Sequence, residues 1–284
     1  MEPVGRAGHE PPLVAIVGPT AAGKSALAIE FARRFAGEVV NFDSVQVYAG
    51  FDVGSGKVRL EERQGIPHHL LDVVGAQEVF TAGDFAREAA LILATLRDRK
   101  KLPILVGGTG LYLRALIQGL SEGPARSESL RARLRKVGER RGREFLHHML
   151  VRLDPASAAR IQPRDTQKII RALEVRFLTG RAISALHASG REGLSGFRPL
   201  TVGLDPPREE LRRRIDARVE RMFQTGLVEE TQSALARLRL DPGSALRLAP
   251  FGALGYRQTC EMLAGRMNRE EAIRKTQAAT RQYA

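Results

Sequence analysis

The stretch GPTAAGKS at residues 18–25 constrains the fold of this chain more than any other feature. Residues 13–17 (LVAIV) come directly before it and are short, apolar and rich in β-branched side chains, which is typical of a buried strand. After it, apolar residues recur at the spacing of one helical face: Ala28, Phe31, Ala32 and Phe35. We expect Gly37 to end that helix. The order strand, glycine loop, helix matches the phosphate-loop pattern G-x-x-x-x-G-K-[ST].

In such a loop the backbone N–H groups cradle a diphosphate, the lysine adds a positive charge, and the serine hydroxyl can bind Mg²⁺. Here those two side chains are Lys24 and Ser25. The alternative is a strand-to-helix turn that is rich in glycine and holds no ligand. The loop alone does not define the reaction.

Composition narrows the class of protein. With 284 residues, 43% of them hydrophobic, the chain is long enough for one large α/β domain or for a domain with an insertion. The single cysteine, Cys260, excludes an intrachain disulfide and a cysteine-cluster zinc site. No apolar run reaches the roughly 18 residues of a membrane span. Residues 1–12 lack the apolar segment of a signal peptide, so we expect a loose leader, a cytoplasmic location and no membrane contact.

The net charge of +13 exceeds what solubility requires. Lysine and arginine gain affinity for polyanions by displacing counterions from phosphates, so this charge favours a nucleic-acid partner. A generally basic surface without such a partner is the alternative.

The first part of the chain alternates strands and helices. Further strands are expected at residues 38–41, 69–74 and 104–106. Thr81 is expected to cap a helix whose apolar face comprises Phe85, Ala89, Ile92 and Leu96. This alternation predicts βαβ units in a parallel sheet, whose ligands bind outside the carboxyl ends of the strands. Residues 18–25, 43–46 and 107–112 should therefore meet at one crevice.

Strand patterns disappear between residues 121 and 197, and arginine-rich helical patterns replace them. One helix should bury Leu130, Leu134 and Val137. A second should begin at Asp165, end at Gly180 and bury Ile170, Leu173 and Phe177, with Gln167, Lys168 and Arg171 on its other face. A strand at 199–204 and a helix that buries Ile215, Val219 and Met222 then return the chain to the sheet. We therefore predict a P-loop NTPase-like parallel sheet flanked by helices (1–120 and 198–284) with an all-helical insertion domain (121–197).

Four further segments carry a resemblance: NFDSVQVYAGFDVGSGK at 41–57, LVGGTGLYLRALIQGL at 105–120, RIDARVERM at 214–222 and LGYRQ at 254–258. With the phosphate loop, their order and content closely resemble the tRNA dimethylallyltransferase (tRNA isopentenyltransferase) family, from about residue 13 to the chain end. The resemblance implies transfer of a dimethylallyl group from its diphosphate to N6 of adenosine 37. That adenosine lies next to the anticodon, in tRNAs that read codons beginning with U.

The resemblance also implies roles for matching residues. Asp43 would receive the N6 proton, and Thr109 would hydrogen-bond the oxygen that bridges C1 to the diphosphate. The diphosphate would be held by Gly18, Pro19, Thr20, Ala21, Ala22, Gly23, Lys24, Ser25 and Arg218, with the cofactor Mg²⁺ on Ser25. The residues implied to contact tRNA, through its anticodon stem-loop, are Ser44, Val45, Gln46, Arg131, Gln167, Lys168, Ile169, Ile170 and Arg171. We expect a monomer. In the family the chain continues past TRQYA into a basic, aromatic segment, and without it we expect weaker tRNA binding.

Each role has a simpler alternative. Asp43 could cap the next turn or help to hold Mg²⁺, and Thr109 could cap the helix that follows it. Arg218, Arg131 and Lys168 could be solvated helix charges. For the whole chain, the rival functions are a small-molecule P-loop kinase, a prenyltransferase acting on free adenine nucleotides, and a non-catalytic RNA-binding protein.

Overall fold

The computed structural model describes residues 10–120, 123–124, 126–188 and 193–284. Most of the predicted leader, residues 1–9, lies outside the described residues. The chain divides into two compact units: a core unit of Met1–Ile117 with Leu194–Ala284, and a helical unit of Gln118–Gly193. These boundaries lie three to four residues before those predicted. None of the helices among the described residues is long and apolar enough to cross a membrane.

The core unit is built on a parallel five-stranded sheet in the order β3-β2-β4-β1-β5. Its strands are β1 (Pro12–Val17), β2 (Gly37–Asn41), β3 (His68–His69), β4 (Leu102–Val106) and β5 (Arg198–Gly203). β1 pairs with β4 on one side and with β5 on the other, and Val14 lies opposite Ile104 of β4 and Leu200 of β5. The phosphate loop thus leaves the sheet between two neighbouring strands.

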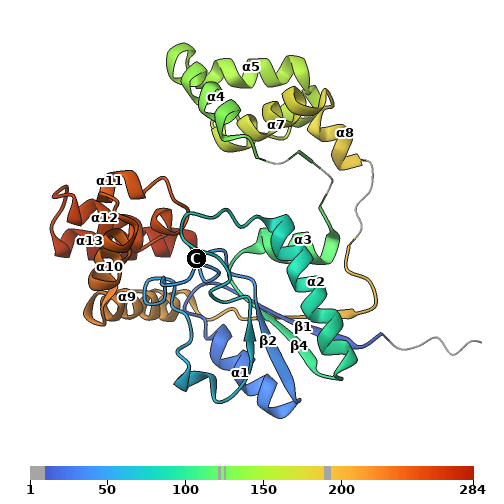
Figure 1. Ribbon diagram of the computed structural model, residues 1–284, viewed down its shortest axis with the longest axis vertical. Coiled ribbons are helices and arrows are strands. Elements are labelled where there is room, and N and C mark those ends of the chain that lie inside the picture. The colour runs from blue at the N-terminus through green and yellow to red at the C-terminus, as the bar shows by residue number, and fades with distance from the viewer. Residues whose placement is uncertain (1–9, 121–122, 125, 189–192) are drawn as a thin grey trace, which may run out of the picture. The chain divides into compact units, whose positions relative to one another are not determined.

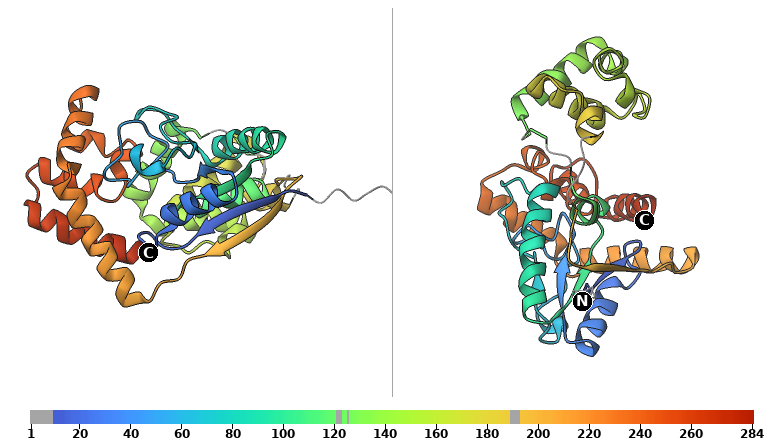
Figure 2. Two further views of the ribbon diagram at one scale, coloured as in Figure 1. Left: turned by 90° about the horizontal axis from the view of Figure 1, so that it is seen from below. Right: turned by 90° about the vertical axis from the view of Figure 1, so that its right-hand side faces the viewer.

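Helices cover both faces of the sheet (Figures 1 and 2). Alternate residues of β1 face opposite sides, since side chains alternate along a strand. Val14 and Ile16 pack with α1 (Lys24–Arg34), whereas Leu13 and Ala15 belong to the larger cluster that includes α2 (Ala82–Asp98). Thr81 caps α2, as predicted, and forms a reciprocal capping box with Asp84.

The remaining helices of the core unit follow β4 and β5. α3 (Gly110–Gln118) begins at the GGTGLY motif. After β5 come α9 (Arg208–Gln224), α10 (Leu227–Leu238), α11 (Pro242–Ala245), α12 (Tyr256–Leu263) and α13 (Arg269–Tyr283). The short 3₁₀ helices are Glu61–Arg63 and Pro250–Gly252. Figure 1 shows α9 to α13 (orange to red) gathered beside the loops at the carboxyl edge of the sheet.

In the helical unit, the described residues form α4 (Glu128–Arg141), α5 (Arg143–Leu153), α6 (Pro155–Ala158), α7 (Thr166–Thr179) and α8 (Ile183–Ala188). These helices enclose their own apolar core, which includes Leu134, Leu146 and Leu173. Asp165 caps α7 by accepting a hydrogen bond from Lys168 N, and Gly180 ends it in the left-handed conformation, both as predicted.

Some local predictions were wrong. The strand predicted at 69–74 is only β3, His68–His69, because Leu70 and Asp72 take φ of 60° and 57°, which interrupts an extended strand. Gly37 does not end α1. It is the first residue of β2, where a Cβ would lie 2.7 Å from the carbonyl oxygen of Leu102.

Two residues of the predicted apolar faces are exposed, and others, among them Leu130, Val137 and Met222, are only partly buried. Phe35 and Phe177 are 52% and 48% exposed, and the buried residue of α9 after Val219 is Phe223 rather than Met222. Met222 is only partly buried because it borders the cavity described next.

Candidate active site

A cavity of about 900 Å³ opens at the carboxyl ends of β1, β2 and β4. The segments that follow those strands all line it, as predicted: the phosphate loop, residues 43–46, and residues 107–109. Segments distant in sequence complete the wall, namely 54–56, 252–254 and parts of α9 and α13. Every lining residue belongs to the core unit.

The phosphate loop has the backbone that an anion site needs. Gly18 has φ of 146°, and a Cβ there would lie 2.6 Å from the carbonyl oxygen of Leu204. No side chain caps the first turn of α1, and that turn contains no acidic residue. The N–H groups and the positive end of the helix dipole thus point toward the cavity without a competing carboxylate.

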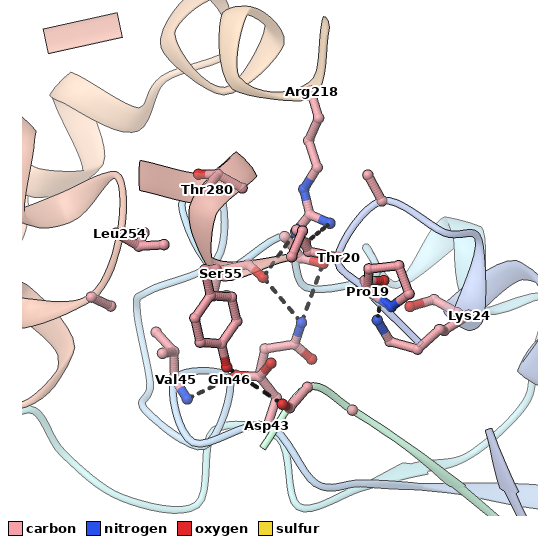
Figure 3. Close-up of a pocket in the computed structure, with 18 of the residues that line it drawn as sticks. Pro19, Thr20, Lys24, Asp43, Val45, Gln46, Ser55, Arg218, Leu254 and Thr280 are labelled. Atoms are coloured by element: carbon pink, nitrogen blue, oxygen red, sulfur yellow. Dashed lines mark hydrogen bonds between the residues drawn. The ribbon is translucent and has the colours of Figure 1, made fainter. Parts of the chain in front are cut away.

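Lys24 and Arg218 supply the positive charge of the cavity. Lys24 Nζ donates to the carbonyl oxygens of Gly18 (3.0 Å) and Pro19 (2.7 Å). Burial, followed by the nearby Arg218 charge, lowers the pKa of Lys24. Arg218 reaches in from α9, and its Nη1 donates to Thr20 Oγ1 at 3.1 Å (Figure 3). Burial lowers the pKa of Arg218 too, although a guanidinium keeps its charge in proteins. Both side chains therefore present positive charge to an anionic ligand.

Asp43 is the one side-chain carboxylate among the lining residues. Its Oδ1 accepts hydrogen bonds from Val45 N (2.9 Å) and Gln46 N (3.4 Å), so Asp43 does cap the turn after β2. In the part of the chain that the structure describes, its Oδ2 accepts no hydrogen bond. Oδ2 faces Gly108, where a Cβ would lie 3.2 Å away. One oxygen thus fixes the side chain, and the other is available to a ligand.

Thr109 is hydrogen-bonded to Ser44, the residue that follows Asp43 in the chain. Its Oγ1 accepts a hydrogen bond from Ser44 N (2.9 Å) and donates one to Ser44 Oγ (3.0 Å). The carbonyl oxygen of Thr109 accepts from Tyr112 N, so its backbone closes the first turn of α3 while its hydroxyl remains at the cavity. Gly107 before it has no room for a Cβ, which would lie 2.5 Å from the carbonyl carbon of Phe42.

The other predicted contact residues divide between the two units. Ser44, Val45 and Gln46 line the cavity, as do residues 18–25 of the phosphate loop and Arg218. Arg131, Gln167, Lys168, Ile169, Ile170 and Arg171 belong to the helical unit.

Within the helical unit, these residues differ sharply in exposure. Ile169 and Ile170 are buried in its apolar core. Arg131 and Arg171 both donate to the fully buried carboxylate of Glu174, at 2.7–3.0 Å. The side chain of Lys168 is 72% exposed and pairs with Asp165 at 2.6 Å. Lys168 is therefore the most exposed cation of this group.

The residues of the cavity fit Mg²⁺ only together with a phosphorylated ligand. No three His, Cys, Asp or Glu side chains cluster as a metal centre within the described ranges. The cavity does hold hard oxygen donors, the hydroxyl of Ser25 and the carboxylate of Asp43. Magnesium usually binds through one or two such protein oxygens, with substrate phosphates and water completing its shell.

The neighbouring histidines at 68–69 and 147–148 belong to no metal-binding cluster among the residues that the structure describes. His69 Nε2 hydrogen-bonds Glu38 Oε2 at 2.8 Å, and His147 Nε2 hydrogen-bonds the carbonyl oxygen of Ile161 at 3.1 Å. The His69 and His147 rings are therefore held by hydrogen bonds within the fold. Cys260 is fully buried, and burial raises the pKa of its thiol to about 11.

Sequence reasoning missed two residues that fix the wall of the cavity. Glu230 of α10 and Tyr256 of α12 hydrogen-bond the backbone of residues 52–54. They lie about 180 and 200 positions from that segment, and nothing in the sequence pattern indicates the contact. The apolar part of the wall also escaped prediction. It comprises Val219, Met222, Ala253 and Leu254.

The fold and the cavity define a class: P-loop-like α/β proteins that bind a phosphorylated ligand at the carboxyl edge of a parallel sheet. Comparison with known proteins identifies the family. Residues 46–284 match the family model described as IPP transferase. A tRNA dimethylallyltransferase of Solibacter usitatus is 50% identical over 96% of this chain and 87% of its own length. The chain therefore belongs to the IPP transferase family.

The solved structures that are similar to this chain include tRNA prenyltransferases, in agreement with the family model. A tRNA isopentenylpyrophosphate transferase from Bacillus halodurans is similar with a TM-score of 0.67 and 36% identity, covering 96% of this chain and 84% of that one. A eukaryotic dimethylallyltransferase acting on tRNA is similar with a TM-score of 0.80 and 29% identity, covering 96% and 68%.

Proposed function

We propose that this chain transfers a dimethylallyl group from dimethylallyl diphosphate to N6 of adenosine 37 in tRNAs that read codons beginning with U. The observation that carries the proposal is one cavity in which two cations, Lys24 and Arg218, share the space with a single carboxylate, Asp43. Membership of the IPP transferase family supports the choice of donor and acceptor.

The phosphate loop would hold the diphosphate of the donor. Its N–H groups, Lys24 and Arg218 stabilise the negative charge that gathers on the departing diphosphate, and each preorganised contact can contribute about 3 kcal/mol. We propose that Mg²⁺, held by Ser25 and the diphosphate, adds charge stabilisation when it is bound. The Thr109 hydroxyl would turn from Ser44 Oγ to the bridging oxygen as that oxygen becomes anionic.

Asp43 would act on the acceptor. The lone pair of an adenine amine is conjugated into the ring, so the amine needs a base that orients it and takes its proton. In the step, a bond forms between N6 and C1 of the donor, and the C1–O bond breaks with its electron pair leaving on diphosphate. The N6 proton passes to Asp43 Oδ2, the oxygen that faces Gly108.

The apolar part of the wall would hold the five-carbon group. Val219, Met222, Ala253 and Leu254 line the cavity and offer no charged side chain. Such a surface suits a short hydrocarbon and keeps water away from C1, which limits hydrolysis of the donor.

The acceptor would be the anticodon stem-loop of a tRNA. Single-stranded loops are the usual targets of sequence-specific RNA recognition, because their bases can be extruded from the stack for a few kcal/mol. The net charge of +13 favours such a partner. We propose that the helical unit contacts the RNA through exposed cations such as Lys168, and that the protein acts as a monomer in the cytoplasm.

Incubation with labelled dimethylallyl diphosphate, Mg²⁺ and either tRNA or AMP tests the proposal, with ATP consumption followed in parallel. We expect label in tRNA and no loss of ATP. Label in AMP would favour a prenyltransferase of free nucleotides, ATP consumption would favour a kinase, and no transfer would leave an RNA-binding protein.

A further inference from the structure

The segment at residues 52–56 (DVGSG) forms part of the cavity wall, and its carbonyl groups hold two side chains of the site. The carbonyl oxygen of Ser55 accepts hydrogen bonds from Gln46 Nε2 at 3.1 Å and from Arg218 Nη2 at 3.4 Å (Figure 3). Gln46 Nε2 also reaches the carbonyl oxygen of Gly56, at 3.3 Å. One carbonyl thus links Arg218, on the donor side of the cavity, to Gln46, which follows Asp43 on the acceptor side.

Arg218 also packs directly on this segment. A Cβ at Gly56 would lie 2.1 Å from Arg218 Nη2, so the guanidinium occupies the space that any other residue would need. Gly56 has φ of 63°, which further favours glycine. The position of Arg218 therefore depends on where the backbone of segment 52–56 lies.

Glu230 fixes that backbone from the outside. Its Oε2 accepts hydrogen bonds from Asp52 N (2.8 Å) and Val53 N (2.9 Å), and its Oε1 accepts one from Gly54 N (3.4 Å). Hydrogen bonds to an ionised carboxylate are stronger than those between neutral groups. A single side chain of α10 thus holds three consecutive N–H groups of the segment.

Tyr256 holds Glu230 in turn. The Tyr256 hydroxyl donates to Glu230 Oε1 at 2.5 Å and accepts from Gly54 N at 3.0 Å. The ring is fully buried and meets the ring of Phe51 edge-on, with 5.1 Å between centroids. A Cβ at Gly54 would lie 2.6 Å from Tyr256 Cζ, which shows how closely the segment rests on this ring.

We propose that Glu230, supported by Tyr256, is a positioning residue of the transfer reaction. Through segment 52–56 it sets the places of Arg218 and Gln46, and so couples the diphosphate subsite to the acceptor subsite. The effect on the acceptor rests on the proposed function, whereas the effect on diphosphate binding does not.

The test is Glu230→Gln, which keeps the shape of the side chain but replaces one acceptor oxygen with an NH₂ group facing the backbone N–H donors. Glu229→Gln is the matched control, because Glu229 is the exposed neighbour on the same helix. Inorganic diphosphate binding is measured by calorimetry with Mg²⁺ present, below the unfolding transition of each variant. Steady-state transfer gives kcat and KM for tRNA.

We expect Glu230→Gln to weaken diphosphate binding about ten-fold and to raise the KM for tRNA, while Glu229→Gln matches the wild type. Equal diphosphate affinity in the two variants would overturn the proposal. A merely structural role would lower the unfolding midpoint and leave the affinity of the folded protein unchanged, which would overturn it as well.

If Glu230→Gln does not fold, Tyr256→Phe tests the positioning role instead. This change keeps the packing of the ring against Phe51 and removes only the hydroxyl. Weaker diphosphate binding in the folded Phe variant supports the proposal, and unchanged binding overturns it. Failure of the wild type to transfer label to tRNA would count against the proposed function alone, since diphosphate binding requires no transfer.

Discussion

The two oxygens of Asp43 have different surroundings. Asp43 can therefore cap a turn with one oxygen and act as a base with the other. Oδ1 caps the turn after β2, and Oδ2 is available at the cavity. The capping role considered from the sequence is therefore real and does not compete with the proposed role as a base. An amide at this position can keep the first role but cannot perform the second.

Asp43→Asn should accordingly lower the single-turnover rate by about 10² or more, the usual contribution of a general base. Donor affinity should stay near that of the wild type, because Oδ1 still accepts from Val45 N and the cavity keeps its shape. Rate and donor affinity are measured at two Mg²⁺ concentrations. Weaker donor binding that extra Mg²⁺ restores would instead assign Asp43 to the metal, and an unchanged rate would leave it as a cap.

Lys24→Ala should weaken binding of the donor and of inorganic diphosphate, because a charge beside the phosphates is lost. Inorganic diphosphate should compete with the donor in the wild type. Arg33→Ala is the control, since Arg33 lies exposed on the same helix, paired with Glu30. Affinity is measured by calorimetry. Equal diphosphate affinity in Lys24→Ala and Arg33→Ala would refute the assignment of the loop.

At the scale of elements, the buried ion cluster of the helical unit predicts a dependence on pH. Burial alone would raise the pKa of Glu174, but hydrogen bonds from Arg131, Arg171 and Ser127 N outweigh it and lower the pKa from 4.5 to about 2. A carboxyl with a lowered folded-state pKa stabilises the fold above its unfolded pKa. This stability is lost as the pH falls through the interval from about 4.5 to 2.

Glu174→Gln should therefore destabilise the protein near neutral pH by at most about 3 kcal/mol, and the difference from the wild type should shrink toward pH 3. Thermal unfolding followed by circular dichroism at pH 7 and pH 3 measures both values. Glu144→Gln, an exposed carboxylate of the same unit, is the control. A difference that is the same at both pH values would contradict the pKa assigned to Glu174.

Lys168 offers a cleaner test of RNA binding than the two arginines, whose removal would leave Glu174 buried without its partners. Lys168→Ala should weaken tRNA binding and reduce the slope of log affinity against log salt by about one, the share of one phosphate contact. Arg176→Ala on the same helix is the control. An unchanged slope for Lys168→Ala would return Lys168 to the role of a solvated charge.

Local sequence signals predicted the elements that depend on local physics. The strand, glycine loop and helix at residues 12–34 follow from hydrophobic period and backbone freedom, and the caps at Thr81 and Asp165 follow from side-chain chemistry. The prediction of local structure failed where contacts between residues far apart in the sequence determine the backbone. The segment after His69 bends away because Asp72 pairs with Lys57 Nζ at 2.5 Å and Asp72 N donates to Gln46 O. Glu230 carries no local signal at all, since its partners are backbone N–H groups far along the chain.

In the whole molecule, the two units have different parts of the proposed function: donor binding in the core unit and RNA binding in the helical unit. The core unit contains the whole lining of the cavity, so donor binding needs no residue of the helical unit. The helical unit has a separate apolar core and carries exposed positive charge. Substitutions in the helical unit should therefore act on tRNA parameters and leave donor affinity unchanged, whereas substitutions at the phosphate loop should do the reverse.

In the proposed function, this chain attaches a dimethylallyl group to one adenosine of a tRNA. Mass spectrometry of nuclease fragments, after reaction of an unmodified tRNA that reads codons beginning with U, tests it most directly. We expect a gain of one dimethylallyl group on the fragment with adenosine 37, located at N6, and no gain in a matched tRNA with guanosine at that position. Modification of both tRNAs, or of neither, would contradict the proposed function.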